Sequence, residues 1–254
     1  MMDSSEKEFI RHLEDLSGRA YNSNQLTHTL FLNPAEVAMA QTLLRAHRGV
    51  PFLFHGGYDD SERKRLFFLP DYIDEEYFPA EEYISAIKAT FSFSSPTHRD
   101  FLGSLMGLGI KREVLGDILV FPDRAYIICA PQMKSFILEN LEKVGKLGIK
   151  CFSIPLSEIE IPEPEFDIIS GTVASLRADS VVSLAFGISR TSAAELISSG
   201  LFSLNHLQEE SISQEISEGD LLSLRGYGRA KLDSIGGISK KGRQFIELHV
   251  FSKK

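Results

Sequence analysis

Apolar residues near the start of the chain recur at helical spacing and then gather in two short runs. Residues 6–18 place their apolar positions three or four residues apart, which predicts a helix with one buried face that ends at Gly18. Asn33 and Pro34 predict the start of a second helix, because an asparagine side chain caps free backbone N–H groups and proline needs no donor at the first helical position. Two apolar runs flank a Gly-Gly turn within residues 50–70 and predict a pair of strands.

The stretch 71–83 holds six acids and no base, and it predicts a solvated connector or short helix that closes a first domain near residue 84. Strand and helix patterns then alternate as β-α-β-β-α-β, the order of the ferredoxin-like unit. The predicted elements are a strand over 84–94, a helix over 97–109, strands over 117–121 and 125–130, a helix over 131–148 and a strand over 150–156.

Residues 158–167 hold five acids and two prolines, too stiff and charged for a core, and we expect a linker or an edge segment there. The apolar positions that follow predict a helix from about Ala178 to Gly187. They predict a second helix over 190–199, which Ser189 caps and Gly200 ends.

Short strands are predicted over 201–204, 221–225 and 244–251, with turns at Asn205-His206 and at Glu218-Gly219-Asp220. The whole pattern predicts an α+β fold of three small domains. These are an N-terminal α/β domain over 1–84, a ferredoxin-like domain over 85–160 and a C-terminal domain over 177–254, with a linker over 161–176.

Charge is distributed unevenly along the chain, whose net charge is −8 at pH 7. Residues 191–224 hold six acids and no base, whereas residues 225–254 hold eight Lys or Arg against two acids, a local charge of +6. Because salt screens charges beyond about 8–10 Å, a polyanion responds to the local patch rather than to the total. The C-terminal residues are therefore where the sequence favours nucleic acid.

The start of the second C-terminal helix is a candidate anion site. Backbone N–H groups without helical partners and the positive end of the helix dipole lie there, beside the guanidinium of Arg190 and the hydroxyls of Ser189 and Thr191. RNA phosphate is the anion we expect. The alternative is that the two hydroxyls only cap the helix and Arg190 is solvated.

Two glycine-containing turns near the C-terminus carry most of the remaining positive charge. Glycines let a backbone approach a ligand closely, arginines bind phosphate with two parallel hydrogen bonds, and tyrosine offers a stacking face. The alternative is a pair of solvated hairpins. The candidate RNA-binding residues of these turns are Arg225, Tyr227, Arg229, Lys240, Lys241 and Arg243.

The loop around His55 is a possible second phosphate site. Gly56 and Gly57 could cradle a phosphate, with Arg63, Lys64 and Arg65 nearby. The alternative is a β-turn followed by a run of surface charges.

Motifs for catalysis, metals and membranes are not apparent in the sequence. The seven histidines lack zinc-site spacing, Cys129 and Cys151 form no CxxC pair, and there is no Walker lysine or GxSxG motif. We therefore expect no catalytic residue, no metal and no cofactor. The cysteines are expected to be buried thiols, and the N-terminus resembles no secretory signal, so we expect a cytoplasmic monomer without membrane insertion.

The succession R-x-D, SR-x-x-A-x-x-LI-x-x-G, EGD, RG-x-GR and KKGR over residues 177–243 is similar to the S4 domain, an RNA-binding module, of the YlmH-like proteins. The stretch HGGYDDSERKR at 55–65 looks like part of that family's N-terminal domain, and the β-α-β-β-α-β middle matches its proposed second RNA-binding domain. The resemblance covers nearly the whole chain. One departure is His206, which stands where many S4 domains have glycine and leaves the shape of that turn open.

This resemblance implies binding to ribosomal RNA of the large subunit and to tRNA, in the rescue of stalled large subunits that carry peptidyl-tRNA. Two alternatives stay open: an RNA-modifying or hydrolytic enzyme anchored by an S4 domain, and an adaptor in cell division that docks through the acidic connectors. By matching position, the resemblance assigns RNA contact to Arg177, Ser189, Arg190, Thr191, Arg225, Arg229, Lys240, Lys241 and Arg243.

Overall fold

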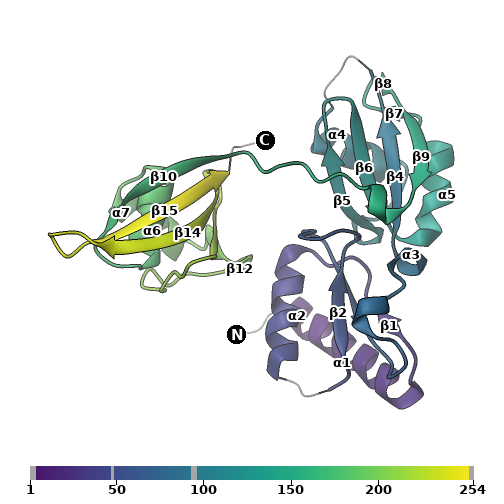
Figure 1. Ribbon diagram of the computed structural model, residues 1–254, viewed down its shortest axis with the longest axis horizontal. Helices are drawn as coiled ribbons and strands as arrows, with labels where there is room; N and C mark the ends of the chain where they lie inside the picture. The colour runs from purple at the N-terminus through teal and green to yellow at the C-terminus, as the bar shows by residue number, and fades with distance from the viewer. Residues whose placement is uncertain (1–3, 47–48, 93–95, 252–254) are drawn as a thin grey trace. The chain divides into compact units, whose positions relative to one another are not determined.

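The computed structural model describes residues 4–46, 49–92 and 96–251, and it divides into two compact units, residues 1–162 and 163–254 (Figure 1). Both units combine helices with antiparallel sheets, so the fold is α+β, as the hydrophobic pattern predicts. Among the described residues, no helix is both long enough and apolar enough to cross a membrane.

The first unit begins with two helices and a three-stranded sheet in the order β1-β3-β2. Leu13 and Leu16 of the first helix and Ala40 of the second share a core with Leu66 and Phe68 of the central strand. The elements are α1 (Ser4–Ser23), β1 (Thr27–His28), α2 (Pro34–Ala46), β2 (Phe52–His55) and β3 (Arg65–Phe68).

The two helix ends predicted in this region have different outcomes. Asn33 Oδ1 accepts a hydrogen bond from the N–H of Glu36 at 3.0 Å, and the Glu36 carboxylate accepts one from the N–H of Asn33 at 2.7 Å, which confirms the start of α2. The predicted end at Gly18 is wrong. Because Ala20 extends the buried face of α1, the helix continues, and Asn24 makes the left-handed turn with a φ of 47°.

A four-stranded sheet, in the order β5-β6-β4-β9, forms the middle of the first unit. Phe101 and Ile137 of two helices pack on one face, and Ile128 on the other face shares a core with Phe67 of β3. The predicted boundary at residue 84 therefore lies inside one packed unit. The elements are β4 (Ser85–Thr90), α4 (His98–Gly107), β5 (Leu115–Val120), β6 (Arg124–Cys129), α5 (Pro131–Asn140) and β9 (Lys150–Ile154).

The helix predicted over 131–148 is too long. The α5 helix ends at Asn140, and a small hairpin follows, with strands β7 (Lys143–Val144) and β8 (Leu147–Gly148). Gly145 reverses the chain with a φ of 59°, and Val144 is buried in the core. The strand predicted over 84–94 ends at Thr90, and its residues 93 and 94 lie outside the described residues.

The connectors of the first unit are single helical turns. The acidic stretch 71–83 forms two of them, which confirms the short-helix alternative for this connector. The turns are η1 (Glu75–Tyr77), α3 (Ala80–Tyr83), η2 (Arg112–Val114) and η3 (Leu156–Glu158).

The C-terminal unit is a six-stranded antiparallel sheet with two helices on one face, in the order β10-β15-β14-β13-β11-β12. Val181 and Ile197 of the helices share a core with Leu222, Leu232 and Leu248 of the strands. The elements are β10 (Phe166–Val173), α6 (Ala178–Phe186), α7 (Arg190–Ser198), β11 (Phe202–Leu204), β12 (Leu207–Gln208), β13 (Leu221–Leu224), β14 (Gly228–Ile238) and β15 (Gln244–Phe251).

Helix ends in this unit agree with the sequence. Of the two alternatives for the acidic segment before it, a linker or an edge segment, the edge segment holds from Phe166 onward. Gly187 ends α6 with a φ of 63°, and Ser189 caps α7. Residues 166–173, placed in the linker 161–176, instead form β10, which pairs with β15 along its whole length at the edge of the sheet. At the turn between β11 and β12, His206 adopts a φ of 70°, so histidine takes the left-handed conformation that glycine favours.

Candidate nucleic-acid interface

Two of the predicted arginines, Arg177 before α6 and Arg190 at the start of α7, lie beside one carboxylate. Ser189 Oγ accepts a hydrogen bond from the N–H of Ser192 at 3.0 Å, so this hydroxyl is a cap, as the alternative interpretation held. Arg190 Nε lies 2.8 Å from Asp179 Oδ2, and Arg177 Nε lies 3.2 Å from Asp179 Oδ1. One carboxylate therefore orients both guanidinium groups. The hydroxyl-bearing Thr191 is exposed beside them.

Asp179 is the residue of this cluster to which sequence reasoning assigned no role. Burial would raise the pKa of its carboxyl group, but the hydrogen bonds from Arg190 and Arg177 outweigh burial and hold that pKa below its ordinary value. The aspartate is therefore ionised at neutral pH and keeps both arginines in position. The R-x-D spacing was the available signal, and only the fold showed that Arg190 joins it.

The turn between β13 and β14 places the first basic cluster on the surface. Gly226 and Gly228 have φ values of 87° and 125°, which a residue with a side chain would rarely adopt. Arg225 and Arg229 are exposed on either side, and the ring of Tyr227 is 38% exposed. This turn therefore offers two cations and a ring face together, as predicted from its sequence.

The three candidate cations of the turn between β14 and β15 have different environments. Lys240 and Lys241 are exposed. Arg243 instead donates from Nε to Thr172 Oγ1 at 3.0 Å and from Nη2 to the Thr172 carbonyl oxygen at 2.6 Å. Its guanidinium thus ties the hairpin to β10, which makes Arg243 a structural contact as well as a surface charge.

The predicted second phosphate site is not on the surface. Arg63 and Arg65 are only 9% and 3% exposed. Arg63 donates to the carbonyl oxygens of Leu115 and Phe31, both at 2.9 Å. Arg65 donates to the carbonyl of Thr29 at 2.9 Å, and burial lowers its pKa to about 10. Both the phosphate-site interpretation and the surface-charge alternative are therefore wrong for these two arginines; Lys64 between them is half-buried.

Gly56 and Gly57 allow close packing instead of ligand approach. A Cβ atom on Gly56 would lie 2.3 Å from Ser61 Oγ. Gly57 has a φ of 105°, and a Cβ there would lie 3.3 Å from side-chain carbons of Ile84 and Ile128. The loop, which contains Gly56 and Gly57, is therefore a joint where segments of the first unit pack against each other.

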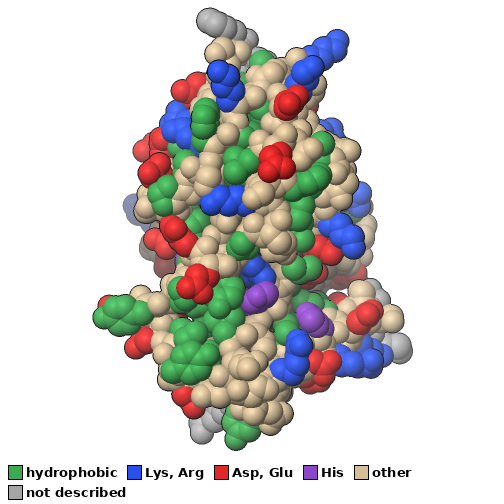
Figure 2. All heavy atoms as spheres, turned by 90° about the vertical axis from the view of Figure 1, so that its right-hand side faces the viewer, with side chains coloured by type: hydrophobic (Ala, Val, Ile, Leu, Met, Phe, Trp, Pro, Cys, Tyr) green, Lys and Arg blue, Asp and Glu red, His purple; other side chains and the backbone are tan. Residues whose placement is uncertain are grey.

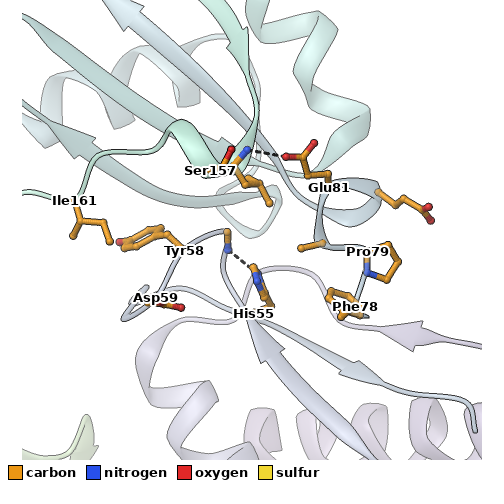
Figure 3. Close-up of a pocket in the computed structure, with 12 residues that line it drawn as sticks. His55, Tyr58, Asp59, Phe78, Pro79, Glu81, Ser157 and Ile161 are labelled. Atoms are coloured by element: carbon orange, nitrogen blue, oxygen red, sulfur yellow. Dashed lines mark hydrogen bonds between the residues drawn. The ribbon is translucent and has the colours of Figure 1, made fainter. Parts of the chain in front are cut away.

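A cavity of about 700 Å³ opens beside this joint (Figure 3). His55 Nδ1 accepts a hydrogen bond from the N–H of Gly57 at 3.0 Å, and burial lowers the pKa of this histidine, so the ring is neutral at pH 7. Glu81 accepts a hydrogen bond from the N–H of Leu156 at 3.0 Å, and Asp59 lies at the rim. Carboxylates around the cavity disfavour the binding of phosphate there.

The first unit presents mixed charge. On the face that Figure 2 shows, acidic and basic side chains are interspersed among apolar ones and do not merge into a continuous basic patch. In the C-terminal unit, exposed cations concentrate over residues 225–243, at Arg225, Arg229, Lys231, Lys240, Lys241 and Arg243, with Arg190 at the start of α7.

One group of side chains in the described part of the chain has the composition of a metal site. Asp233, Glu247 and His249 place their ligand atoms within 4.8 Å of one another. His249 Nδ1 lies 3.6 Å from Asp233 Oδ1, and Nε2 lies 4.0 Å from Glu247 Oε1, which is also the arrangement of a histidine between two ion-pair partners.

Among the thiols, Cys129 is buried as predicted and Cys151 is half-buried. Burial raises the pKa values to about 12 and 11, so neither is a ready nucleophile.

The fold is α+β with exposed cations clustered over residues 225–243, and comparisons with known proteins identify the family. Residues 80–158 match the family model described as "Putative RNA-binding domain in YlmH", and residues 5–73 match "YlmH, N-terminal". The "Ribosome-associated protein quality control protein P2" of Bacillus subtilis (strain 168) is 36% identical over 218 residues, which are 85% of this chain and 83% of that protein. The chain belongs to the YlmH family.

A solved structure has a similar fold. The "Cell division protein ylmH from Streptococcus pneumoniae" is 25% identical, with a TM-score of 0.52, and the match covers 64% of this chain and 98% of that one. These findings confirm the family resemblance read from the motifs.

Proposed function

We propose that this protein is a non-enzymatic RNA-binding protein of the cytoplasm that associates with the large ribosomal subunit and tRNA. Its role would be in the rescue of stalled large subunits that carry peptidyl-tRNA. The name of the B. subtilis relative and the description of the family model over 80–158 support ribosome association and RNA binding. The finer statements about tRNA and stalled subunits rest on the family resemblance.

We further propose that the chain is a three-part binder. The element order β4-α4-β5-β6-α5-β9 and the strand order β5-β6-β4-β9 support a ferredoxin-like middle domain. The helix pair α6 and α7, followed by the small sheet, supports an S4 domain at the C-terminus. The acidic remainder would limit binding to one directed surface.

The observation that carries this proposal is the exposure of Arg225 and Arg229 beside two glycines of positive φ. Exposed guanidinium groups next to an open backbone turn can bind phosphate with two parallel hydrogen bonds each. The arginines of the first unit's corresponding segment cannot do so, because Arg63 and Arg65 are buried away from the surface.

Replacing Arg225 and Arg229 with alanine tests the function. We expect the double variant to co-sediment less with purified large subunits, and the slope of log affinity against log salt to fall by roughly one unit per lost phosphate contact. The matched control removes two exposed charges from α1, Lys7 and Arg11. Unchanged co-sedimentation of the double variant at matched salt would show that the C-terminal turns are not the ribosome-binding site.

The non-enzymatic part of the proposal has its own test. The purified protein is incubated with ribosomal RNA and, separately, with peptidyl-tRNA. Mass spectrometry of the nucleotides should then show no modified base, and no peptide should be released. Either product would favour the RNA-modifying or hydrolytic alternative.

A further inference from the structure

Three neighbouring strands of the C-terminal sheet, β10, β15 and β14, lie side by side (Figure 1). On the face opposite α6 and α7, their side chains form rows across the strands. Side chains alternate between the two faces along each strand. Ala230, Leu232 and Leu248 are fully buried toward the helices, so the alternate residues of these strands lie on the other face.

The strand pairing aligns these outward residues in two rows. Phe166 pairs with Phe251, which pairs with Arg229. Ile168 pairs with His249, which pairs with Lys231 in the same way. Each row therefore runs from an apolar side chain through a ring to a cation.

The rings of this face are already arranged for stacking. Phe166 and His249 stack with their centroids 4.0 Å apart and their planes 12° from parallel, and Phe251 meets Phe166 edge-on at 6.3 Å. Phe166 is 37% exposed and Ile168 is 60% exposed. A planar group could therefore extend the existing ring stack while covering an apolar side chain that water now contacts.

Cations stand at the β14 end of the same rows. Both Arg229 and Lys231 are exposed, and the Arg229 guanidinium carbon lies 5.8 Å from the centre of the Phe251 ring. The acids Asp233 and Glu247 lie next to His249 and would repel phosphate from that side. An anionic backbone would thus be directed along the edge of the face that Arg229 and Lys231 form.

We propose that this face, defined by Phe166, Ile168, Arg229, Lys231, His249 and Phe251, binds a single-stranded RNA segment. Its bases stack on the Phe166 ring stack and its phosphates contact Arg229 and Lys231. Base–aromatic stacking and a basic track are how sheet surfaces bind unpaired nucleic acid without reading its sequence. The proposal rests on the proposed function of RNA binding and adds the class of RNA and a second surface, distinct from the start of α7.

The test measures binding of the full-length protein to a labelled eight-nucleotide single-stranded RNA of mixed sequence by fluorescence anisotropy. We expect Phe166→Leu, which keeps the apolar bulk and removes the ring, to weaken binding by about tenfold, the size of one lost base–ring stack. Phe166→Trp should restore binding. Circular dichroism and thermal melting check that each variant is folded.

Phe245 supplies the matched control. It lies on the same face of β15 and is 49% exposed, but it pairs with Thr172, whose oxygens already accept from Arg243, and none of the described rings stacks on it. We expect Phe245→Leu to change affinity by less than twofold. Equal effects of the two leucine substitutions would overturn the proposal, because they would reflect general loss of apolar surface.

Other outcomes separate this inference from the function on which it rests. If wild type co-sediments with large subunits but does not bind the single-stranded probe, the function stands and this surface assignment fails. If Phe166→Leu no longer co-sediments with large subunits but still binds the probe as wild type does, the face binds protein, and the proposal is again overturned. If wild type binds neither large subunits nor the single-stranded probe, the proposed function and this inference are both rejected.

Discussion

Two arginine-rich segments, one in each unit, look alike along the chain and have opposite environments in the folded protein. Arg63 and Arg65 are buried and donate to backbone carbonyls, whereas Arg225 and Arg229 are exposed beside a glycine turn. Arg65 begins β3, whose following residues are fully buried, and the strand carries it into the core. Charge along a sequence therefore predicts an RNA site only where the backbone leaves that charge at the surface.

The largest effect that we expect is a loss of stability when the buried Arg65 is replaced. Arg65→Ala removes the donors that satisfy the carbonyls of Thr29 and Tyr83, which lie 2.9 and 2.5 Å from its nitrogens. Because buried acceptors then lose their partners, we expect the free energy of unfolding of the first unit to fall by about 3 kcal/mol. Urea unfolding of the full chain, followed by intrinsic tyrosine fluorescence, measures it.

Arg11→Ala is the control for this loss, since Arg11 is exposed on α1. It should change stability by less than about 0.5 kcal/mol. Should Arg65→Ala keep full stability and lose large-subunit binding, Arg65 would be an RNA contact and the contrast between the two segments would fail.

A smaller effect is expected at the acid that positions two arginines of the C-terminal unit. Asp179→Asn removes the charge that Arg177 and Arg190 share, and we expect a loss of about 1–2 kcal/mol, because solvent screens guanidinium groups that are part-exposed. Since the folded-state pKa of Asp179 lies below its unfolded value, this stability is present above about pH 4 and is lost as pH falls through the folded pKa.

Comparing wild type with Asp179→Asn from pH 7 down to pH 2 therefore checks the sign. The difference in the urea midpoint should be constant near neutrality and should vanish in acid. A difference that grows as the pH falls would mean that the Asp179 pKa is raised, not lowered. RNA affinity should fall along with stability at neutral pH, since Arg177 and Arg190 lose their common anchor.

The smallest effects are expected at two glycines, one in each unit, that both looked like helix ends. Gly187→Ala should cost about 1 kcal/mol, because the residue has a φ of 63°. Gly18→Ala should instead stabilise by about 0.5–1 kcal/mol, because Gly18 is inside α1 and a Cβ there meets no atom within 4 Å. Thermal melting of both variants gives the two signs, and equal signs would contradict the helix bounds.

The sequence-based predictions that the structure corrects share a physical cause. Residues 166–173 alternate as a strand, yet nearby acids and prolines left a linker or an edge segment open, and only pairing with β15 makes them the edge of a sheet. The helix predicted over 131–148 failed because a buried valine and a left-handed glycine formed a hairpin after Asn140. The exposed face that Phe166 and His249 build was missed for the same reason. Its alternation was present in the sequence, but its neighbours on the other strands were unknown.

Local signals by themselves determined the caps at Asn33 and Ser189, the end of α6 at Gly187, the strand and helix order of the middle, and the basic turns of the C-terminal unit. These features depend on hydrogen bonds and backbone angles within a few residues, which the sequence specifies directly. Only tertiary structure decided that Arg63 and Arg65 are buried, that Asp179 holds two arginines, and that rings and cations align in rows. Those outcomes depend on which distant segments pack together, and packing sets the solvent exposure on which binding depends.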